Sequence, residues 1–180
     1  MKGTSYVIGL IVYIASVVLP ILLSSKAISF IHIALYAAFS LIIIAGATID
    51  MHYYILPDEG AMALVLGGII YSYINDKSML ITLLSIMSVG AITYGLRLIS
   101  HNGFGLGDVK WFSAIATWLT PWEIVCFFYV AFCVGSLYLL LTGYRNRYIA
   151  FGPFLCFGGW CALHGGLYME VIYQWLRYNL

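Results

Sequence analysis

Apolar residues occur along this chain in long runs that short polar breaks interrupt. A helix needs about 20 apolar residues to cross roughly 30 Å of hydrocarbon, because each residue adds about 1.5 Å. The runs predict an all-α bundle of about seven membrane-spanning helices. These are expected at 3–25, 27–49, 60–75, 78–96, 109–119, 124–144 and 148–169. Because the fifth run is short, the count is six to seven.

The composition supports a chain embedded in a lipid bilayer. Hydrophobic residues make up 63% of the 180 positions and charged residues only 8%, whereas about 25% is typical of a soluble domain. We therefore expect a single membrane-embedded domain over 1–180, with no large aqueous part. The net charge of +1 provides no positive field for binding nucleic acid.

The basic residues predict how the helices are oriented. With seven spans, five basic residues fall on one side of the membrane and three on the other, and the richer side is expected to be cytoplasmic. The first group is Lys2, Arg97, Lys110, Arg145 and Arg147; the second is Lys26, Lys77 and Arg177.

Two acidic residues at the ends of predicted spans are candidates for chemistry, because acids are costly in a membrane chain. Asp50 follows the second span and Asp108 precedes the fifth, so two crossings return both to the same face. If the carboxyl groups meet, charge repulsion and desolvation favour one shared proton, the arrangement of aspartic proteases. The alternative is that each acid only borders its helix in the headgroup region.

Three glycines alternate immediately before Asp108, at Gly103, Gly105 and Gly107. Glycine lets a backbone approach another chain closely. A phosphate-binding loop is the rival interpretation, but a carboxylate at a helix N-terminus would repel the anion, and the P-loop Lys-Ser/Thr ending is missing. We therefore discount phosphate binding.

Three motifs follow one another along the chain: Ile49-Asp50 with Leu56-Pro57-Asp58, then Gly105-Leu106-Gly107-Asp108-Val109-Lys110, then Phe151-Gly152-Pro153-Phe154. Together they resemble the type IV prepilin peptidase family, membrane aspartic proteases of the GxGD class. The resemblance implies that Asp50 and Asp108 are the catalytic pair and that no metal or organic cofactor takes part. It implies motif or substrate-binding roles for Pro57, Asp58, Gly105, Gly107, Lys110, Gly152 and Pro153.

The resemblance also implies a substrate and a location. The substrate is a type IV prepilin or pseudopilin precursor, whose basic leader is removed after a glycine at the cytoplasmic face of the bacterial inner membrane. Many family members carry two C-x-x-C pairs before the first aspartate and also N-methylate the trimmed pilin. The chain has no such cysteines, so we expect peptidase activity alone. The particular pilin and the oligomeric state stay open.

Some motif residues have a second interpretation. Asp58 and Glu59 would attract a basic leader, or they are acids that favour a helix N-terminus. Lys110 would lower the pKa of a neighbouring carboxylate, or it extends to the headgroups. Pro57 and Pro153 are expected to shape helix entry.

A metal site is a weaker hypothesis. His52 and His101 lie near the two aspartates in the sequence, but no tight ligand spacing such as H-x-x-x-H is present. The four cysteines sit in apolar runs without a C-x-x-C pair and are expected to be packing residues. They are Cys126, Cys133, Cys156 and Cys161.

Two functions of other classes compete with proteolysis. Asp50 and Asp108 would form a relay in a small proton-coupled transporter, although such acids are expected near the bilayer midplane and these lie at span ends. The chain would otherwise be a non-catalytic membrane subunit of a pilus or secretion assembly.

Overall fold

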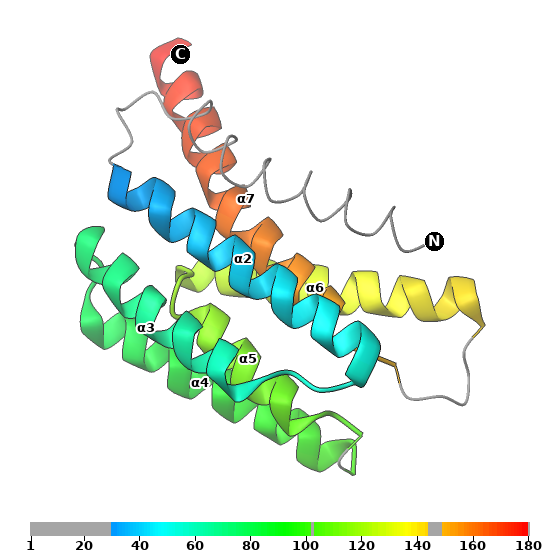
Figure 1. Cartoon of the computed structure of the whole chain (residues 1–180). Coiled ribbons are helices and arrows are strands. Elements are labelled where there is room, and N and C mark those ends of the chain that lie inside the picture. The colour runs from blue at the N-terminus through cyan, green and yellow to red at the C-terminus, as the bar shows by residue number, and fades with distance from the viewer. Residues whose placement is uncertain (1–29, 102, 144–148, 180) are drawn as a thin grey trace.

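The structure is a computed structural model that describes residues 30–101, 103–143 and 149–179, with side chains described as far as 165. Every regular element in these residues is an α-helix (Figure 1). The helices are α2 (Phe30–Tyr53), α3 (Asp58–Ile74), α4 (Met79–Ile99), α5 (Leu106–Ala116), α6 (Pro121–Thr142) and α7 (Gly152–Asn179).

The predicted all-helical class is confirmed for the described residues, but the predicted number of six to seven spans is not. Three helices, α2, α4 and α6, are long and apolar enough to cross a membrane. The first predicted span, 3–25, lies outside the described residues. The fifth becomes α5, whose 11 residues extend about 16 Å and are too short to cross.

One predicted boundary was wrong in a way that matters for the site. The second span was expected to end before Asp50, whereas α2 continues to Tyr53 and includes Asp50 in its last turn. By contrast, α6 begins at Pro121, only three residues before the predicted span 124–144. Thr120 is its N-cap, and the Glu123 carboxylate accepts a hydrogen bond of 2.6 Å from the Thr120 N–H.

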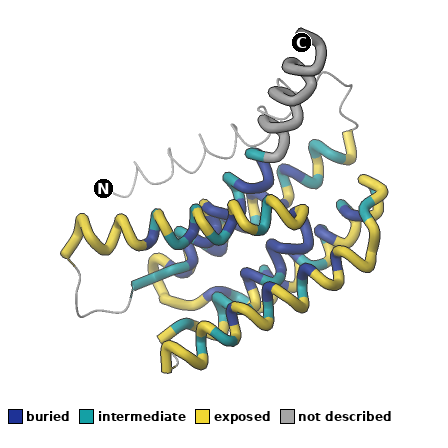
Figure 2. The backbone as a smooth tube through the Cα atoms, turned by 180° about the vertical axis from the view of Figure 1, so that it is seen from behind, coloured by how far each residue is buried: buried dark blue, intermediate teal, exposed yellow. Residues whose placement is uncertain are grey.

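The helices surround the short α5. It packs against α3, α4 and α7, while α2 packs against α3 and α7, and α6 packs against α7. Residues that face a neighbouring helix are mostly buried, and residues on the outward faces are mostly exposed (Figure 2). Many outward side chains are large and apolar, such as Leu66, Met87 and Leu140. Such an exterior suits a hydrocarbon solvent.

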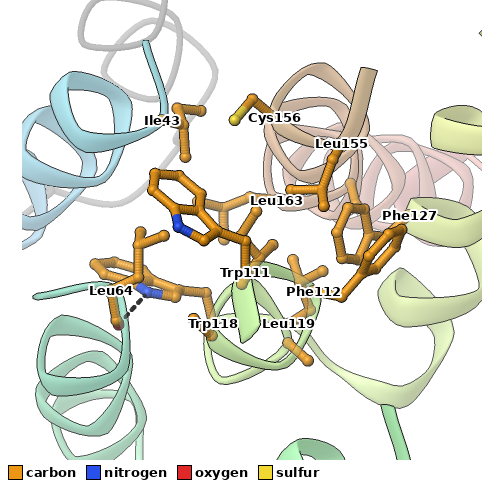
Figure 3. Close-up of a cluster of buried hydrophobic side chains, with 14 of the residues drawn as sticks. Ile43, Leu64, Trp111, Phe112, Trp118, Leu119, Phe127, Leu155, Cys156 and Leu163 are labelled. Carbon is orange, nitrogen blue, oxygen red and sulfur yellow. Dashed lines mark hydrogen bonds between the residues drawn. The ribbon is translucent and has the colours of Figure 1, made fainter. Parts of the chain in front are cut away.

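Two tryptophans, one in α5 and one just after it, form the centre of the core (Figure 3). Trp111 is fully buried and Trp118, just beyond the helix, is nearly so. The Trp118 Nε1–H donates to the Leu64 carbonyl at 2.8 Å, and the Trp111 Nε1–H donates to the Pro57 carbonyl at 3.0 Å. The indole N–H of each buried tryptophan therefore has a hydrogen-bond acceptor, which lies in α3 for Trp118 and in the residue before α3 for Trp111.

Glycines on α2 and α3 provide the space for the Trp111 ring. A Cβ added at Gly46 would lie 2.1 Å from Trp111 Cη2, and one at Gly60 would lie 2.6 Å from Trp111 Cζ2. Both distances are far below van der Waals contact. Trp111 therefore fixes the position of α5 against α2 and α3 at these two points.

The far end of α5 is held by a lysine from the loop between α3 and α4. The Lys77 Nζ donates to the carbonyls of Thr117, at 3.3 Å, and of Leu119. The last carbonyls of a helix have no partner within the helix, so a cation there is favourable. The Ser72 hydroxyl also donates to the Thr117 carbonyl, at 3.2 Å.

We expect Gly46→Ala to destabilise the protein, because the added methyl group would overlap the Trp111 ring. Overpacking a filled core costs about 1–3 kcal/mol. The measurement is denaturant unfolding in detergent micelles. Gly95→Ala is the matched control, because a Cβ at Gly95 in α4 meets nothing within 4 Å. Equal unfolding midpoints for the two variants would contradict the role of the Trp111 contact.

Candidate active site

Asp50 lies in the last turn of α2, and its residue is only 5% exposed. A buried carboxylate needs hydrogen-bond donors. The backbone N–H of Gly152 donates to Asp50 Oδ2 at 2.8 Å. Gly152 is the first residue of α7, so Asp50 is bound by the N-terminus of a helix whose dipole favours a negative charge.

The close approach of Asp50 explains why position 152 is a glycine. A Cβ there would lie 2.6 Å from Asp50 Oδ2 and 2.9 Å from its Cβ. Pro153 follows as the second residue of α7. At this position the missing N–H of proline removes no hydrogen bond within the helix. Both residues of the predicted motif therefore help α7 to begin against Asp50.

Asp108 lies in the first turn of α5 and is partly buried. Its Oδ2 accepts a hydrogen bond of 3.2 Å from the N–H of Gly105, the N-cap residue of α5. A Cβ at Gly105 would lie 2.8 Å from the same oxygen. Both predicted catalytic carboxylates therefore accept a hydrogen bond from a glycine N–H at the start of a helix.

The structure brings the charges of Asp50 and Asp108 together from α2 and α5. Burial raises the pKa of Asp108 to about 6, and the negative charge of Asp50 also raises it, whereas the Gly105 N–H lowers it. The Cys156 thiol of α7 is within electrostatic range of both carboxylates. A pair of this kind favours the state in which one carboxyl group is ionised and the other holds a proton.

The glycine-rich loop before α5 is held from α4. Arg97 Nη1 donates to the Phe104 carbonyl at 2.7 Å, and the Phe104 N–H donates to Ser100 Oγ at 3.2 Å. The Phe104 ring packs edge-on against Phe151, which precedes α7. The two segments that carry the glycine donors are therefore in contact with each other.

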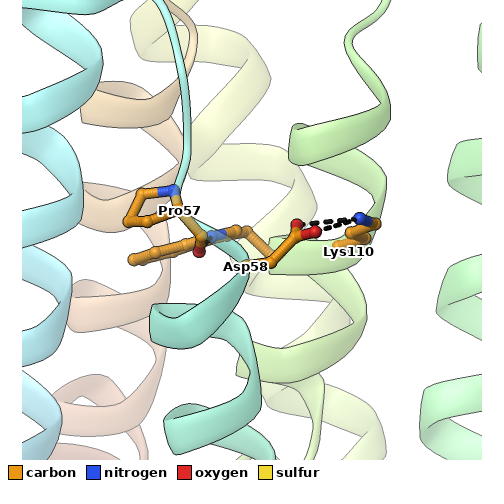
Figure 4. Close-up of polar contacts among 4 residues, drawn as sticks. Pro57, Asp58 and Lys110 are labelled. Atoms are coloured by element: carbon orange, nitrogen blue, oxygen red, sulfur yellow. Dashed lines mark hydrogen bonds and ion pairs between the residues drawn. The ribbon is translucent and has the colours of Figure 1, made fainter.

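Asp58 and Lys110 form an ion pair beside the loop (Figure 4). The Lys110 Nζ donates to both Asp58 oxygens, at 2.6 and 2.8 Å, and joins the start of α3 to α5. Both side chains are substantially exposed, so the pair contributes little to stability. A Cβ at Gly107 would lie 3.3 Å from the Leu56 Cβ, which shows how closely these segments approach.

The histidines near the aspartates in the sequence do not gather around them. His52 Nδ1 lies 2.8 Å from the Thr48 carbonyl of its own helix, and His101 is exposed in the loop after α4. Among the residues whose side chains are described, no group of three or more His, Cys, Asp or Glu is placed to hold a metal ion.

The structural roles of two residues, Trp111 and Arg97, are not predicted by the sequence pattern. The sequence predicts for Arg97 only a place on the cytoplasmic side of the membrane. Trp111 lies three residues after Asp108 and therefore on the same face of the helix. This spacing is a sequence signal for a residue that packs beneath the aspartate. Arg97 gave no local signal, because its partner lies seven residues away in an irregular loop.

Known proteins resemble this chain over most of its length. Prepilin leader peptidase/N-methyltransferase of Aeromonas hydrophila is 24% identical over 149 residues, 77% of this chain and 50% of that protein. Leader peptidase HopD of Escherichia coli is 30% identical over 138 residues, 69% of this chain and 86% of that protein. The chain spans about half the length of most of the curated relatives it matches. No solved structure matches it.

The model of the type IV leader peptidase family matches residues 36–140. This segment is more than half of the chain, and it includes both Asp50 and Asp108. The expected resemblance is thereby confirmed, and the chain belongs to the type IV leader peptidase family.

Proposed function

We propose that this protein is an aspartic endopeptidase that removes the basic leader from type IV prepilin or pseudopilin precursors. The observation that carries the proposal is that Asp50 of α2 and Asp108 of α5 each accept a hydrogen bond from a glycine N–H at a helix start. The negative charge of Asp50 also raises the pKa of Asp108, which supports their proximity. Family membership and the relatives' names, which describe prepilin leader peptidases, support the substrate class.

The proposed chemistry uses the two carboxyl groups and one water molecule. Asp50, as the ionised member, accepts a proton from the water as its oxygen attacks the scissile carbonyl carbon. Asp108, as the protonated member, donates a hydrogen bond to the carbonyl oxygen and then a proton to the leaving amine. The assignment of the proton to Asp108 is supported by the effects of burial and of Asp50 on its pKa.

The proposed location is the cytoplasmic side of the bacterial inner membrane, with residues 1–180 acting as one peptidase domain. The leader carries positive charge in the cytoplasm, and the cut follows a glycine at the membrane boundary. The position of both acids at helix ends supports a boundary site. The same position disfavours a proton relay, which requires acids deeper in the bilayer.

We expect Asp50→Asn and Asp108→Asn each to lower the cleavage rate about 10²- to 10⁴-fold, because each change removes one half of the acid–base pair. The measurement is release of the leader from a synthetic prepilin peptide by purified protein in lipid nanodiscs. The double variant should be no slower than the slower single variant, because the two groups act as a unit.

Asp76→Asn is the matched control for both substitutions. Asp76 is exposed in the loop between α3 and α4 and has a φ of 52°, a conformation that asparagine tolerates. We expect its cleavage rate to equal that of the wild type. Normal cleavage by either active-site variant would contradict the proposed mechanism.

The pKa of Asp108 predicts how cleavage depends on pH. The mechanism requires a proton on Asp108, and this proton is lost as the pH rises through about 6. We therefore expect kcat/KM, which reports the free enzyme, to decrease above that pH. A series of initial rates in overlapping buffers measures the curve. A constant kcat/KM from about pH 5 to about pH 8 would contradict this assignment.

We expect Gly152→Ala to impair cleavage, because the added Cβ would displace the Asp50 carboxyl group. A displacement of about 1 Å costs on the order of 10²-fold in rate. Gly165→Ala, on the same helix, is the control, because a Cβ there meets nothing within 4 Å. Initial cleavage rates are compared at equal amounts of folded protein. Equal rates would show that Gly152 does not position Asp50.

A further inference from the structure

The peptide group between Phe104 and Gly105 is bound at both ends. Its carbonyl oxygen accepts a hydrogen bond of 2.7 Å from Arg97 Nη1. Its N–H donates a hydrogen bond of 3.2 Å to Asp108 Oδ2. A single planar unit therefore connects a guanidinium group on α4 with a carboxyl group on α5.

We propose that Arg97 is a positioning residue that acts on Asp108 through this peptide group. The inference rests on the proposed leader peptidase function. Arg97 is placed on the far side of the peptide, so it acts on Asp108 without contacting the carboxyl group. Its role differs from the one that the sequence predicted, which was a positive charge marking the cytoplasmic side.

Two physical effects follow from this connection. A peptide group is planar, so fixing its carbonyl also fixes the direction in which its N–H points. A charged donor at the carbonyl also polarises the group and strengthens the N–H as a donor. Arg97 therefore holds the Asp108 carboxyl group in place and favours its ionised form.

Ser100 allows this role to be separated from simple loop anchoring. Its hydroxyl accepts from the N–H of Phe104, which belongs to the preceding peptide group. Ser100 therefore holds the same loop from the same helix end, but it makes no contact with the peptide group that binds Asp108. A change at Ser100 loosens the loop and leaves the Arg97 connection present.

The other charged and titratable groups near Asp108 come from each neighbouring helix. Asp50 of α2 acts on it directly, and the Cys156 thiol of α7 interacts with both acids. Lys110 of α5 is already paired with Asp58 of α3. Among the described side chains, Arg97 is the cation connected to Asp108 through a hydrogen-bonded group.

The test compares Arg97→Gln, Arg97→Lys and Ser100→Ala with the wild type. Cleavage of the prepilin peptide is measured across pH in nanodiscs, with kcat and KM determined separately and the unfolding midpoint recorded for each variant. For Arg97→Gln we expect kcat to fall about tenfold with KM unchanged. The alkaline limit of kcat/KM should move up by about one pH unit, because Asp108 then holds its proton more tightly.

Arg97→Lys keeps a charged donor, so its alkaline limit of kcat/KM should lie close to the wild-type pH. Ser100→Ala should lower the unfolding midpoint without moving the limit. Repeating the series in about 1 M salt distinguishes an effect of Arg97 through the hydrogen-bonded peptide group from a long-range effect of its charge. At this salt concentration the Debye length is about 3 Å, so long-range effects of exposed charges are largely screened. The shift of Arg97→Gln should persist there.

Three results would overturn the inference. The first is an alkaline limit of kcat/KM in Arg97→Gln at the same pH as in the wild type. The second is an upward shift of this limit in Ser100→Ala equal to that in Arg97→Gln, and the third is a shift in Arg97→Gln that disappears in high salt. If Arg97→Gln does not fold, a wild-type limit in the folded Arg97→Lys combined with a shift in Ser100→Ala would also overturn it. If the wild type cleaves no leader, the proposed function itself fails. Normal wild-type cleavage with any of the overturning results leaves that function standing.

Discussion

The contact between Trp111 and two glycines is the constraint on which the site depends. The ring occupies space beside Gly46 of α2 and Gly60 of α3 that any larger residue would fill. Asp50 follows Gly46 by four residues, and Asp108 precedes Trp111 by three. Because residues three or four apart share a helix face, one contact places both acids on facing surfaces. The distance between two carboxyl groups is therefore set about one helical turn away from them, in the apolar core.

The two acids are stabilised in the same manner from opposite parts of the chain. Each accepts a hydrogen bond from a glycine N–H, Gly152 for Asp50 and Gly105 for Asp108. In both cases a side chain on the glycine would collide with the carboxyl oxygen. A backbone donor is directional and adds no formal charge, and it favours the ionised form of the carboxyl group that it binds.

The sequence was sufficient for the helical class and for the family, because both depend on local patterns. Long apolar runs report spans, and the motifs around Asp50 and Asp108 identify the family. The catalytic roles of these residues stay predictions. The apolar run of α5 suggested a membrane span, but the helix is too short to cross. Hydropathy alone does not show that Lys77 binds the carbonyls at the end of this helix. The contacts of Trp111 and Arg97 join residues on different helices or loops, and no periodicity within one segment encodes such contacts.

Lys77 has a consequence for how an apolar bundle accommodates a helix that does not cross it. A helix that stops inside the protein leaves its last carbonyls without water, and lipid offers them no donor. The ammonium group reaches in from the loop between α3 and α4 and supplies that donor from the opposite end of α5. Because Lys77 binds these carbonyls, α5 does not have to be long enough to span the bilayer. A segment of only 11 residues can present an acid at one surface while its other end terminates on a cation.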